Sequence, residues 1–317
     1  MKFYQLANGD TIPALGLGTW KSEKGKVAQA IKKALQIGYR HFDCAPIYGN
    51  EVEIGQAIKE ALDSGLIKRE ELWITSKLWN NAHEPESVLP ALQKTLKDLQ
   101  VDYLDLYLIH WPVVLKQGVG LPEKAEDFRP RDEVPLAETW KAMEDCLVEG
   151  LCKHLGVSNF SQKKLANLLE SGAVKPEVNQ VEAHPYLQQK ELLEYCQREN
   201  VLVCAYSPLG SGDRPAFLKK KDEPNLREHP RLKQIAQARG ISPAQVLLSW
   251  GLNRGTIVIP KSVNPVHMQK NFEAVEVELN HQEMEALAEL DIHYRFVDGS
   301  FWEMPGSSYT VSSIWDE

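Results

Sequence analysis

GYRHFDCAPIYGNEVEIGQAIKEAL, residues 38–62, contains the unit that predicts the fold of the chain. A short β-strand is expected at Tyr39–Asp43. It is followed by a loop that carries Tyr48 and by Glu51–Leu62, which has the spacing of an amphipathic helix. The same succession of strand pattern, loop and helix pattern recurs along the sequence. Such alternation predicts parallel strands joined by helical crossovers.

Eight strands are expected in total. They lie at Ala14–Gly18, Tyr39–Asp43, Leu72–Lys77, Tyr103–His110, Lys153–Val157, Glu177–Val181, Leu202–Tyr206 and Thr256–Ile259. The helical patterns between them lie at Val27–Ile37, Glu51–Leu62, Pro85–Leu99, Leu136–Glu149, Ser161–Leu169, Gln188–Glu199, Pro230–Arg239 and Pro243–Asn253. Eight units favour an α/β fold of the closed (β/α)8 barrel type over an open doubly wound sheet. The segment Gly16–Trp20 lacks the third glycine of a dinucleotide-binding fingerprint, which also argues against the open sheet.

The remaining segments are expected to extend one barrel domain that covers residues 1–317. At the start, Phe3–Leu6, Asn8-Gly9 and Thr11-Ile12 predict a β-hairpin with a two-residue turn. Two long polar loops, 113–135 and 211–229, and the aromatic tail 296–317 are expected over the C-terminal face of the barrel. The tail could either close over a pocket or form a peripheral packing patch.

Composition excludes several classes of partner. The formal net charge is −8 and there is no basic block, so a nucleic-acid partner is not expected, and any phosphate site must be a local cluster of positive charge. No apolar run approaches the length of a membrane span. The five cysteines are odd in number and irregularly spaced, with no metal-binding pattern, which favours reduced thiols in a cytoplasmic protein.

Polar residues follow the strands at the end where barrel enzymes carry their chemistry. Four of them stand out: Asp43, Tyr48, Lys77 and His110. Each alone has an ordinary explanation, such as a turn residue, a solvated charge or a packing aromatic. Together they supply an acid, a phenol, an ammonium and an imidazole on one face.

These four groups fit the reduction of a carbonyl. Hydride addition to a carbonyl leaves an alkoxide, which needs a proton, and Tyr48 can donate it. A free tyrosine has a pKa of about 10, and a nearby ammonium lowers that value. Lys77 could do this while Asp43 keeps Lys77 charged and oriented. His110 could hydrogen-bond the carbonyl oxygen and set its geometry.

The chain resembles the aldo-keto reductases over essentially its whole length. The stretches that carry the resemblance are residues 38–62, LDLYLIHWP (104–112), GVSNFSQKKLANLL (156–169), AYSPLGSGDRP (205–215) and IVIPKSVNPVHMQKN (257–271). The resemblance implies a monomeric (β/α)8 barrel and a catalytic tetrad at Asp43, Tyr48, Lys77 and His110. A related group that reduces carbon–carbon double bonds has Glu in place of His110, so carbonyl reduction is favoured here.

The resemblance also implies a nicotinamide cofactor and its contacts. The implied contacts are Thr19, Trp20, Lys21, Ser158, Asn159, Gln180, Tyr206, Ser207, Leu209, Ser211, Asp213, Lys261, Ser262, Val263, Asn264, His267 and Asn271. Among them, Tyr206 would stack on the nicotinamide, and Lys261 and Ser262 would hold the 2′-phosphate of NADPH. The sequence departs from the family at His267, usually Arg, and at Lys270, usually Glu. We therefore expect NADPH/NADP⁺ to be preferred, with NADH accepted more weakly.

The expected substrate pocket is aromatic and apolar. Its expected residues are Trp20, Ile47, Trp79, Trp111 and Trp302, with Phe128 a further candidate and no metal. The resulting hypothesis is an NADP(H)-dependent aldehyde reductase of the alcohol dehydrogenase type, which reversibly reduces aldehydes and some ketones. The alternatives are a sugar or sugar-phosphate (aldose) reductase, a non-catalytic nicotinamide-binding structural or regulatory protein, and a barrel hydrolase or isomerase.

Overall fold

The computed structural model describes residues 1–23 and 25–317, except the side chain of Phe217. Its centre is a curled sheet of eight parallel strands in the order β10-β9-β8-β7-β6-β5-β4-β3. The strands are β3 (Leu17–Gly18), β4 (His41–Asp43), β5 (Trp73–Leu78), β6 (Leu104–Ile109), β7 (Cys152–Ser158), β8 (Val178–Glu182), β9 (Leu202–Tyr206) and β10 (Ile257–Val258). Every residue of β5 and β6 is buried, as strands enclosed on both faces require.

Hydrogen bonds between the first and last strand regions close the sheet into a barrel. Leu15 forms a parallel bridge with Val258, and Gly18 forms another with Lys261. The Val258 amide donates to Ala14 O at 2.9 Å, and the Gly16 amide donates to Val258 O at 2.9 Å. The fold is therefore the (β/α)8 barrel that the alternating pattern predicts.

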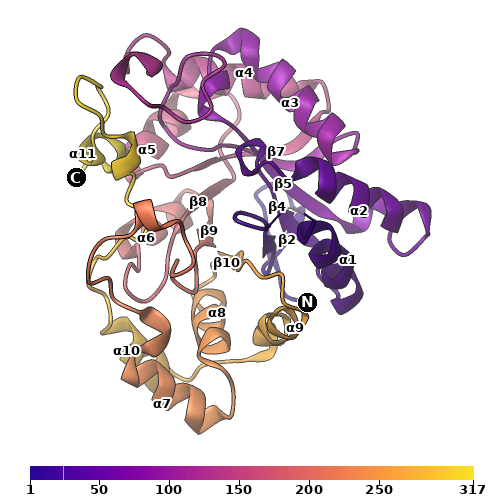
Figure 1. The fold of residues 1–317 in the computed structure, drawn as a ribbon, viewed down its shortest axis with the longest axis vertical. Helices are drawn as coiled ribbons and strands as arrows, with labels where there is room; N and C mark the ends of the chain where they lie inside the picture. The colour runs from indigo at the N-terminus through magenta and orange to yellow at the C-terminus, as the bar shows by residue number, and fades with distance from the viewer. Residues whose placement is uncertain (24) are drawn as a thin grey trace.

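The helices surround the strands (Figure 1). They are α1 (Val27–Ile37), α2 (Glu51–Asp63), α3 (Pro85–Leu99), α4 (Leu136–Val148), α5 (Gln162–Ser171), α6 (Lys190–Arg198), α7 (Pro230–Arg239), α8 (Pro243–Asn253), α9 (Pro265–Glu273), α10 (His281–Ala288) and α11 (Val311–Trp315). The sequence patterns give no bounds for the last three, which follow β10. Among the described residues, no helix is long and apolar enough to cross a membrane.

The N-terminal hairpin differs in its turn from the sequence prediction. Strands β1 (Phe3–Gln5) and β2 (Thr11–Pro13) pair with Gln5 opposite Thr11. The Leu6 amide donates to Asp10 O and the Gly9 amide to Leu6 O, so the two-residue turn is wrong and the loop is wider. Only Gly9 in this loop has a positive φ, of 95°, whereas the tight two-residue turn needs two such residues.

The hairpin seals the N-terminal end of the barrel. Leu6 and Ile12 join an apolar cluster with barrel residues such as Leu106, Leu108 and Val178. The polar groups that follow the strands lie at the opposite end. The hairpin therefore covers the end of the barrel that lies away from these polar groups.

The C-terminal tail packs against the loop of residues 113–135. In Figure 1 the yellow tail lies beside this magenta loop, and the Val114 amide donates to the Tyr309 hydroxyl at 3.1 Å. Trp302 is fully buried, with ring centroids 5.8 Å from Trp79 and 5.9 Å from Trp111. The tail is thus part of the packed structure at the C-terminal face.

Replacing Gly55 with Ala should destabilise the protein. Gly55 lies in α2, and a Cβ there would stand 2.3 Å from Asp98 O and 2.5 Å from Leu99 C in the adjoining α3. This backbone clash should outweigh the better helix propensity of Ala, with a net loss of about 1–3 kcal/mol in the free energy of unfolding. Denaturant unfolding measures it, with Gly120→Ala as control because nothing lies within 4 Å of its Cβ position. A Gly55→Ala protein as stable as the parent would contradict the tight α2–α3 contact.

Candidate active site

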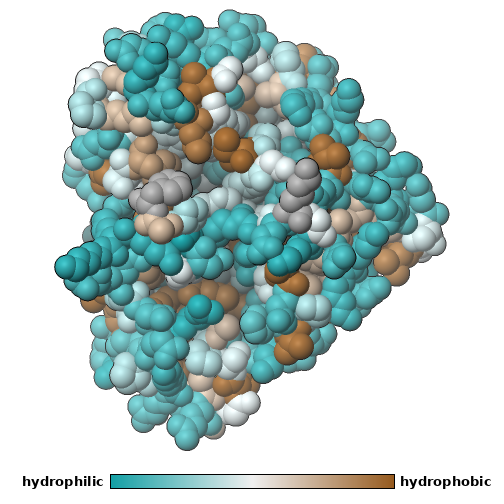
Figure 2. Space-filling view, viewed as in Figure 1, coloured by the Kyte–Doolittle hydropathy of each residue, from teal (hydrophilic) through white to brown (hydrophobic). Residues whose placement is uncertain are grey.

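A cavity of about 570 Å³ opens at the C-terminal end of the barrel. It is lined by residues at the ends of the strands, by the loop Ser207–Asp213 and by Val297 and Phe301 of the tail. In the space-filling view the surface is hollowed near its middle, with apolar side chains on the margin of the hollow (Figure 2). The four candidate catalytic residues lie at or directly beneath the floor of this cavity.

Lys77 and Asp43 form a buried ion pair below the cavity. Lys77 Nζ donates to Asp43 Oδ1 at 2.9 Å, to Asp43 Oδ2 at 2.8 Å and to Cys44 O at 2.9 Å. Gln180 Nε2 also donates to Asp43 Oδ1, at 2.8 Å. Lys77 is the penultimate residue of β5, is fully buried and does not line the cavity, so it acts on the cavity only through its neighbours.

Tyr48 lies between this ion pair and the cavity. It ends the 3₁₀ turn Pro46–Tyr48, and its hydroxyl oxygen is 3.5 Å from Lys77 Nζ. Burial raises the pKa of Tyr48 to about 12, while the Lys77 ammonium opposes that rise. The sequence predicts the effect of Lys77 in the right direction but misses the larger effect of burial.

His110 is neutral at physiological pH. Burial, followed by the nearby Lys77 and His83, holds the pKa of His110 well below its usual value. Its ring meets the Tyr48 ring edge-on at 5.8 Å and the Trp79 ring at 5.0 Å between centroids. A neutral imidazole in this position can hydrogen-bond a substrate oxygen but carries no extra proton to give away.

Amide and hydroxyl groups surround the same end of the cavity. Asn159 Nδ2 donates to His110 O at 2.9 Å, Ser158 Oγ donates to Gln180 O at 2.9 Å, and the Tyr206 hydroxyl donates to Asn159 Oδ1 at 2.8 Å. Asn159 has a φ of 63°, a conformation that Asn tolerates better than most residues. These contacts hold the Tyr206 ring and the neighbouring polar groups in the cavity wall.

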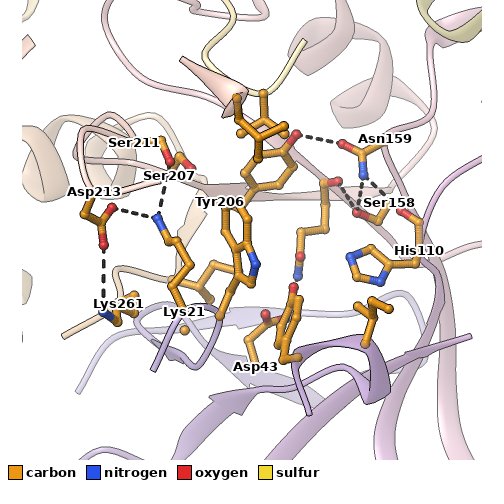
Figure 3. A pocket seen from close by; sticks show the side chains of 18 of the residues that line it. Lys21, Asp43, His110, Ser158, Asn159, Tyr206, Ser207, Ser211, Asp213 and Lys261 are labelled. Carbon is orange, nitrogen blue, oxygen red and sulfur yellow. Dashed lines mark hydrogen bonds and ion pairs between the residues drawn. The ribbon is translucent and has the colours of Figure 1, made fainter. Parts of the chain in front are cut away.

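A group of charged residues lies at the other end of the cavity. Lys21 Nζ is 2.6 Å from Asp213 Oδ1, and Lys261 Nζ is 3.7 Å from Asp213 Oδ2. Figure 3 shows these three side chains on one side of Tyr206, with His110, Ser158 and Asn159 on the other. Ser211 Oγ, at 3.4 Å from Lys21 Nζ, belongs to the same group. The arrangement forms a local cationic end in an acidic protein.

Several residues implied for the cofactor lie outside the cavity wall. Thr19 is buried beneath it, where its hydroxyl donates to Asp43 O at 2.8 Å. Ser262 and Val263 precede α9 and are partly buried, and His267 is exposed in its first turn. Asn264 caps α9 by accepting from the amides of Val266 and His267. Asn271 is buried on the same helix.

The part of the cavity near His110, where the sequence predicts a substrate pocket, is mostly apolar. Of the residues expected there, Trp20, Ile47, Trp79 and Trp111 line the cavity. Trp302 does not line it, because the 3₁₀ turn Ser300–Trp302 places Trp302 in the buried layer behind Trp79 and Trp111. Phe128 is likewise buried, against Tyr309.

Sequence reasoning missed four apolar residues of this wall. They are Leu121 and Pro122 of the loop 113–135, and Val297 and Phe301 of the tail. The length and composition of the two segments predict that they lie over the C-terminal face of the barrel. No periodic pattern indicates which of their residues face the cavity. Trp79 Nε1 donates to Gly120 O at 2.7 Å, which holds Leu121 and Pro122 at the mouth of the cavity.

Comparisons of sequence and of structure identify proteins that are similar to this chain. The model of the Aldo/keto reductase family matches residues 14–292. An aldo/keto reductase of Synechocystis sp. is 56% identical over all of this chain and 97% of its own length. Human aldo-keto reductase family 1 member A1 is 47% identical over 92% of this chain and 90% of its own. The solved aldose reductase of Schistosoma japonicum superposes with a TM-score of 0.87 at 43% identity, covering 95% of this chain and 96% of that one.

These relatives are all named as reductases, and they indicate that this chain is an oxidoreductase. The family model spans most of the barrel, from the first strand region to the segment after α10. The chain therefore belongs to the aldo/keto reductase family.

Proposed function

We propose that this protein reduces aldehydes, and some ketones, to alcohols with NADPH, reversibly and with Tyr48 as the proton donor. The observation that carries the proposal is the arrangement of Tyr48 and His110 on one cavity floor, above the buried Lys77–Asp43 pair. We further propose that residues 1–317 form one catalytic domain and that the protein is a cytoplasmic monomer. That part rests on the family resemblance and on five free, buried cysteines.

The cavity residues fit a nicotinamide dinucleotide. Ser158, Asn159 and Gln180 offer amide and hydroxyl groups at the end near Tyr48, and Tyr206 offers an aromatic face beside them. The loop Ser207–Asp213 follows, and Lys21 and Lys261 supply positive charge at the far end. When bound, the cofactor supplies the hydride.

The protein side chains divide the remaining work. His110 hydrogen-bonds the carbonyl oxygen in its neutral form and so orients the carbon that is attacked. Tyr48 donates its phenolic proton to the developing alkoxide, and the Lys77 ammonium stabilises the phenolate that is left. Asp43 keeps Lys77 charged, because its carboxylate raises the pKa of Lys77 against the opposing effect of burial. Trp20, Trp79 and Trp111 exclude water from the reacting atoms.

The apolar wall favours aldehydes with hydrophobic or aromatic tails over sugar phosphates. Trp20, Ile47, Trp79 and Trp111, which line the cavity together with His110, offer no cation for a phosphate. The direct test is NADPH oxidation with an aromatic aldehyde and, in parallel, with a hexose phosphate. A clear preference for the hexose phosphate would favour the sugar-phosphate alternative, and tight NADPH binding without turnover would favour a non-catalytic role.

Replacing Tyr48 with Phe should remove most turnover. Loss of a general acid typically reduces kcat by about 10²–10⁴-fold, whereas NADPH binding should persist because the phenol does not hold the cofactor. Steady-state kinetics and an NADPH dissociation constant measure the two effects. In the parent, Tyr48 and His110 should cause no change in kcat for reduction between about pH 6 and 8, because the pKa of Tyr48 is raised to about 12 and that of His110 is held well below its usual value. Retained activity in Tyr48→Phe, or a fall in kcat through this range, would point to another proton donor.

Replacing Lys261 with Met should reduce the selectivity for NADPH over NADH. Loss of a charged hydrogen bond to the 2′-phosphate should raise the NADPH dissociation constant about 10–100-fold, and NADH, which lacks that phosphate, should change far less. Fluorescence titration measures both constants. Lys59→Met is the matched control, because Lys59 is exposed on α2 and pairs with Asp63. Equal losses for both cofactors would assign Lys261 to the Asp213 contact alone.

A further inference from the structure

Glu182 is a buried carboxylate for which the chemistry described above has no use. It is the last residue of β8, two positions beyond Gln180, and its side chain is fully buried. It does not line the cavity, so it cannot touch a substrate there. A charged group in such a place needs strong hydrogen bonds to be tolerated.

Two partners of the Glu182 carboxylate come from the C-terminal tail, and His184 is a third. The Phe296 amide donates to Oε1 at 2.7 Å and the Val297 amide donates to Oε2 at 2.7 Å. His184 Nε2 lies 2.8 Å from Oε1 and donates to it when that nitrogen carries the proton. Two consecutive backbone amides on the two oxygens of one carboxylate fix both the position and the direction of the chain at this point.

The segment held by Glu182 forms part of the substrate wall. Val297, one of the two anchored residues, lines the cavity, and Phe301 lines it four residues later. Between them, Asp298 O accepts from Trp315 Nε1 at 2.7 Å, and the Asp298 carboxylate is 2.6 Å from Lys220 Nζ. The segment is therefore held at one end by hydrogen bonds to the Glu182 carboxylate and at the other end by the buried Trp302.

Strand β8 connects this wall to the catalytic floor. Gln180 and Glu182 are two residues apart, so their side chains leave the same face of the strand. Gln180 bonds Asp43, while Glu182 bonds the tail. The spacing between the catalytic groups and the substrate wall is consequently set by one strand.

We infer that Glu182 is a positioning residue for substrate selection, which holds Val297 and Phe301 against the substrate through the amides of Phe296 and Val297. The inference rests on the proposed reductase activity. Glu182 takes no part in proton transfer. It affects the binding of larger aldehydes that reach Val297 and Phe301, and not the binding of small aldehydes that occupy only the space above Tyr48.

The test compares Glu182→Gln with the parent on two aldehydes, propanal and 4-nitrobenzaldehyde. The Gln side chain has nearly the same shape as Glu, but its amide nitrogen cannot accept a hydrogen bond. One of the two tail amides therefore loses its acceptor. KM for 4-nitrobenzaldehyde should rise about tenfold, while kcat, KM for propanal and the NADPH dissociation constant should stay within about twofold. Hydrogen exchange at the Phe296 and Val297 amides should become faster, a readout that does not depend on turnover.

Matched variants separate positioning from a general loss of structure. Glu177→Gln is the control, because Glu177 precedes the same strand at its other end and bonds His154 at 2.7 Å, far from the tail. It should leave both KM values unchanged. Phe301→Ala should raise KM for 4-nitrobenzaldehyde, and Glu182→Gln should raise KM by a smaller factor in that background than in the parent, because the two changes share the Phe301 contact.

Several results would overturn the inference. They are an equal rise in KM for both aldehydes, a rise in the NADPH dissociation constant of the same size, and unchanged KM with unchanged amide exchange. If Glu182→Gln does not fold, Glu182→Asp, which keeps the charge on a shorter arm, must show the same selective rise. A parent protein that turns over neither aldehyde would refute the proposed function instead, while faster amide exchange in the variant would still establish the anchor.

Discussion

The buried ion pair between Lys77 and Asp43 is the constraint on which the rest of the site depends. Both side chains are buried, and each has the other as its main partner at 2.8–2.9 Å. Removing one partner of such a pair leaves an uncompensated buried charge and typically costs about 3–5 kcal/mol. The barrel can hold the pair because β4 and β5 are adjacent parallel strands that place both residues at the same end.

Burial is the main influence on the pKa values of His110 and Tyr48, and the positive charge of Lys77 acts on both. It adds to burial in lowering the pKa of His110, and it opposes burial at Tyr48 by favouring the phenolate. The charge therefore disfavours a protonated imidazole and makes the phenol a better acid than burial alone would leave it. This asymmetry supports the proposed roles, hydrogen bonding for His110 and proton donation for Tyr48, on physical grounds.

The sequence predicts the parts of this architecture that parallel strands impose. Asp43, Lys77 and His110 could be placed together because each ends a predicted strand, and the C-terminal ends of such strands meet. Trp302 could not be placed, because nothing in a tail without periodicity indicates that a 3₁₀ turn buries this residue and leaves Phe301 in the wall. The raised pKa of Tyr48 could not be predicted either, because the burial that raises it depends on tertiary contacts that the sequence alone does not reveal.

The catalytic floor and the substrate wall are held by different kinds of interaction. Backbone ladders of the closed barrel fix the floor, so its geometry is shared by every strand around the ring. The wall is held by side chains that reach single backbone groups, as Trp79 does at Gly120 and Glu182 does at Val297. A change in one wall contact therefore moves a few apolar residues and leaves the Lys77–Asp43 pair in place. This separation allows the range of substrates to change while the proton-transfer chemistry stays the same.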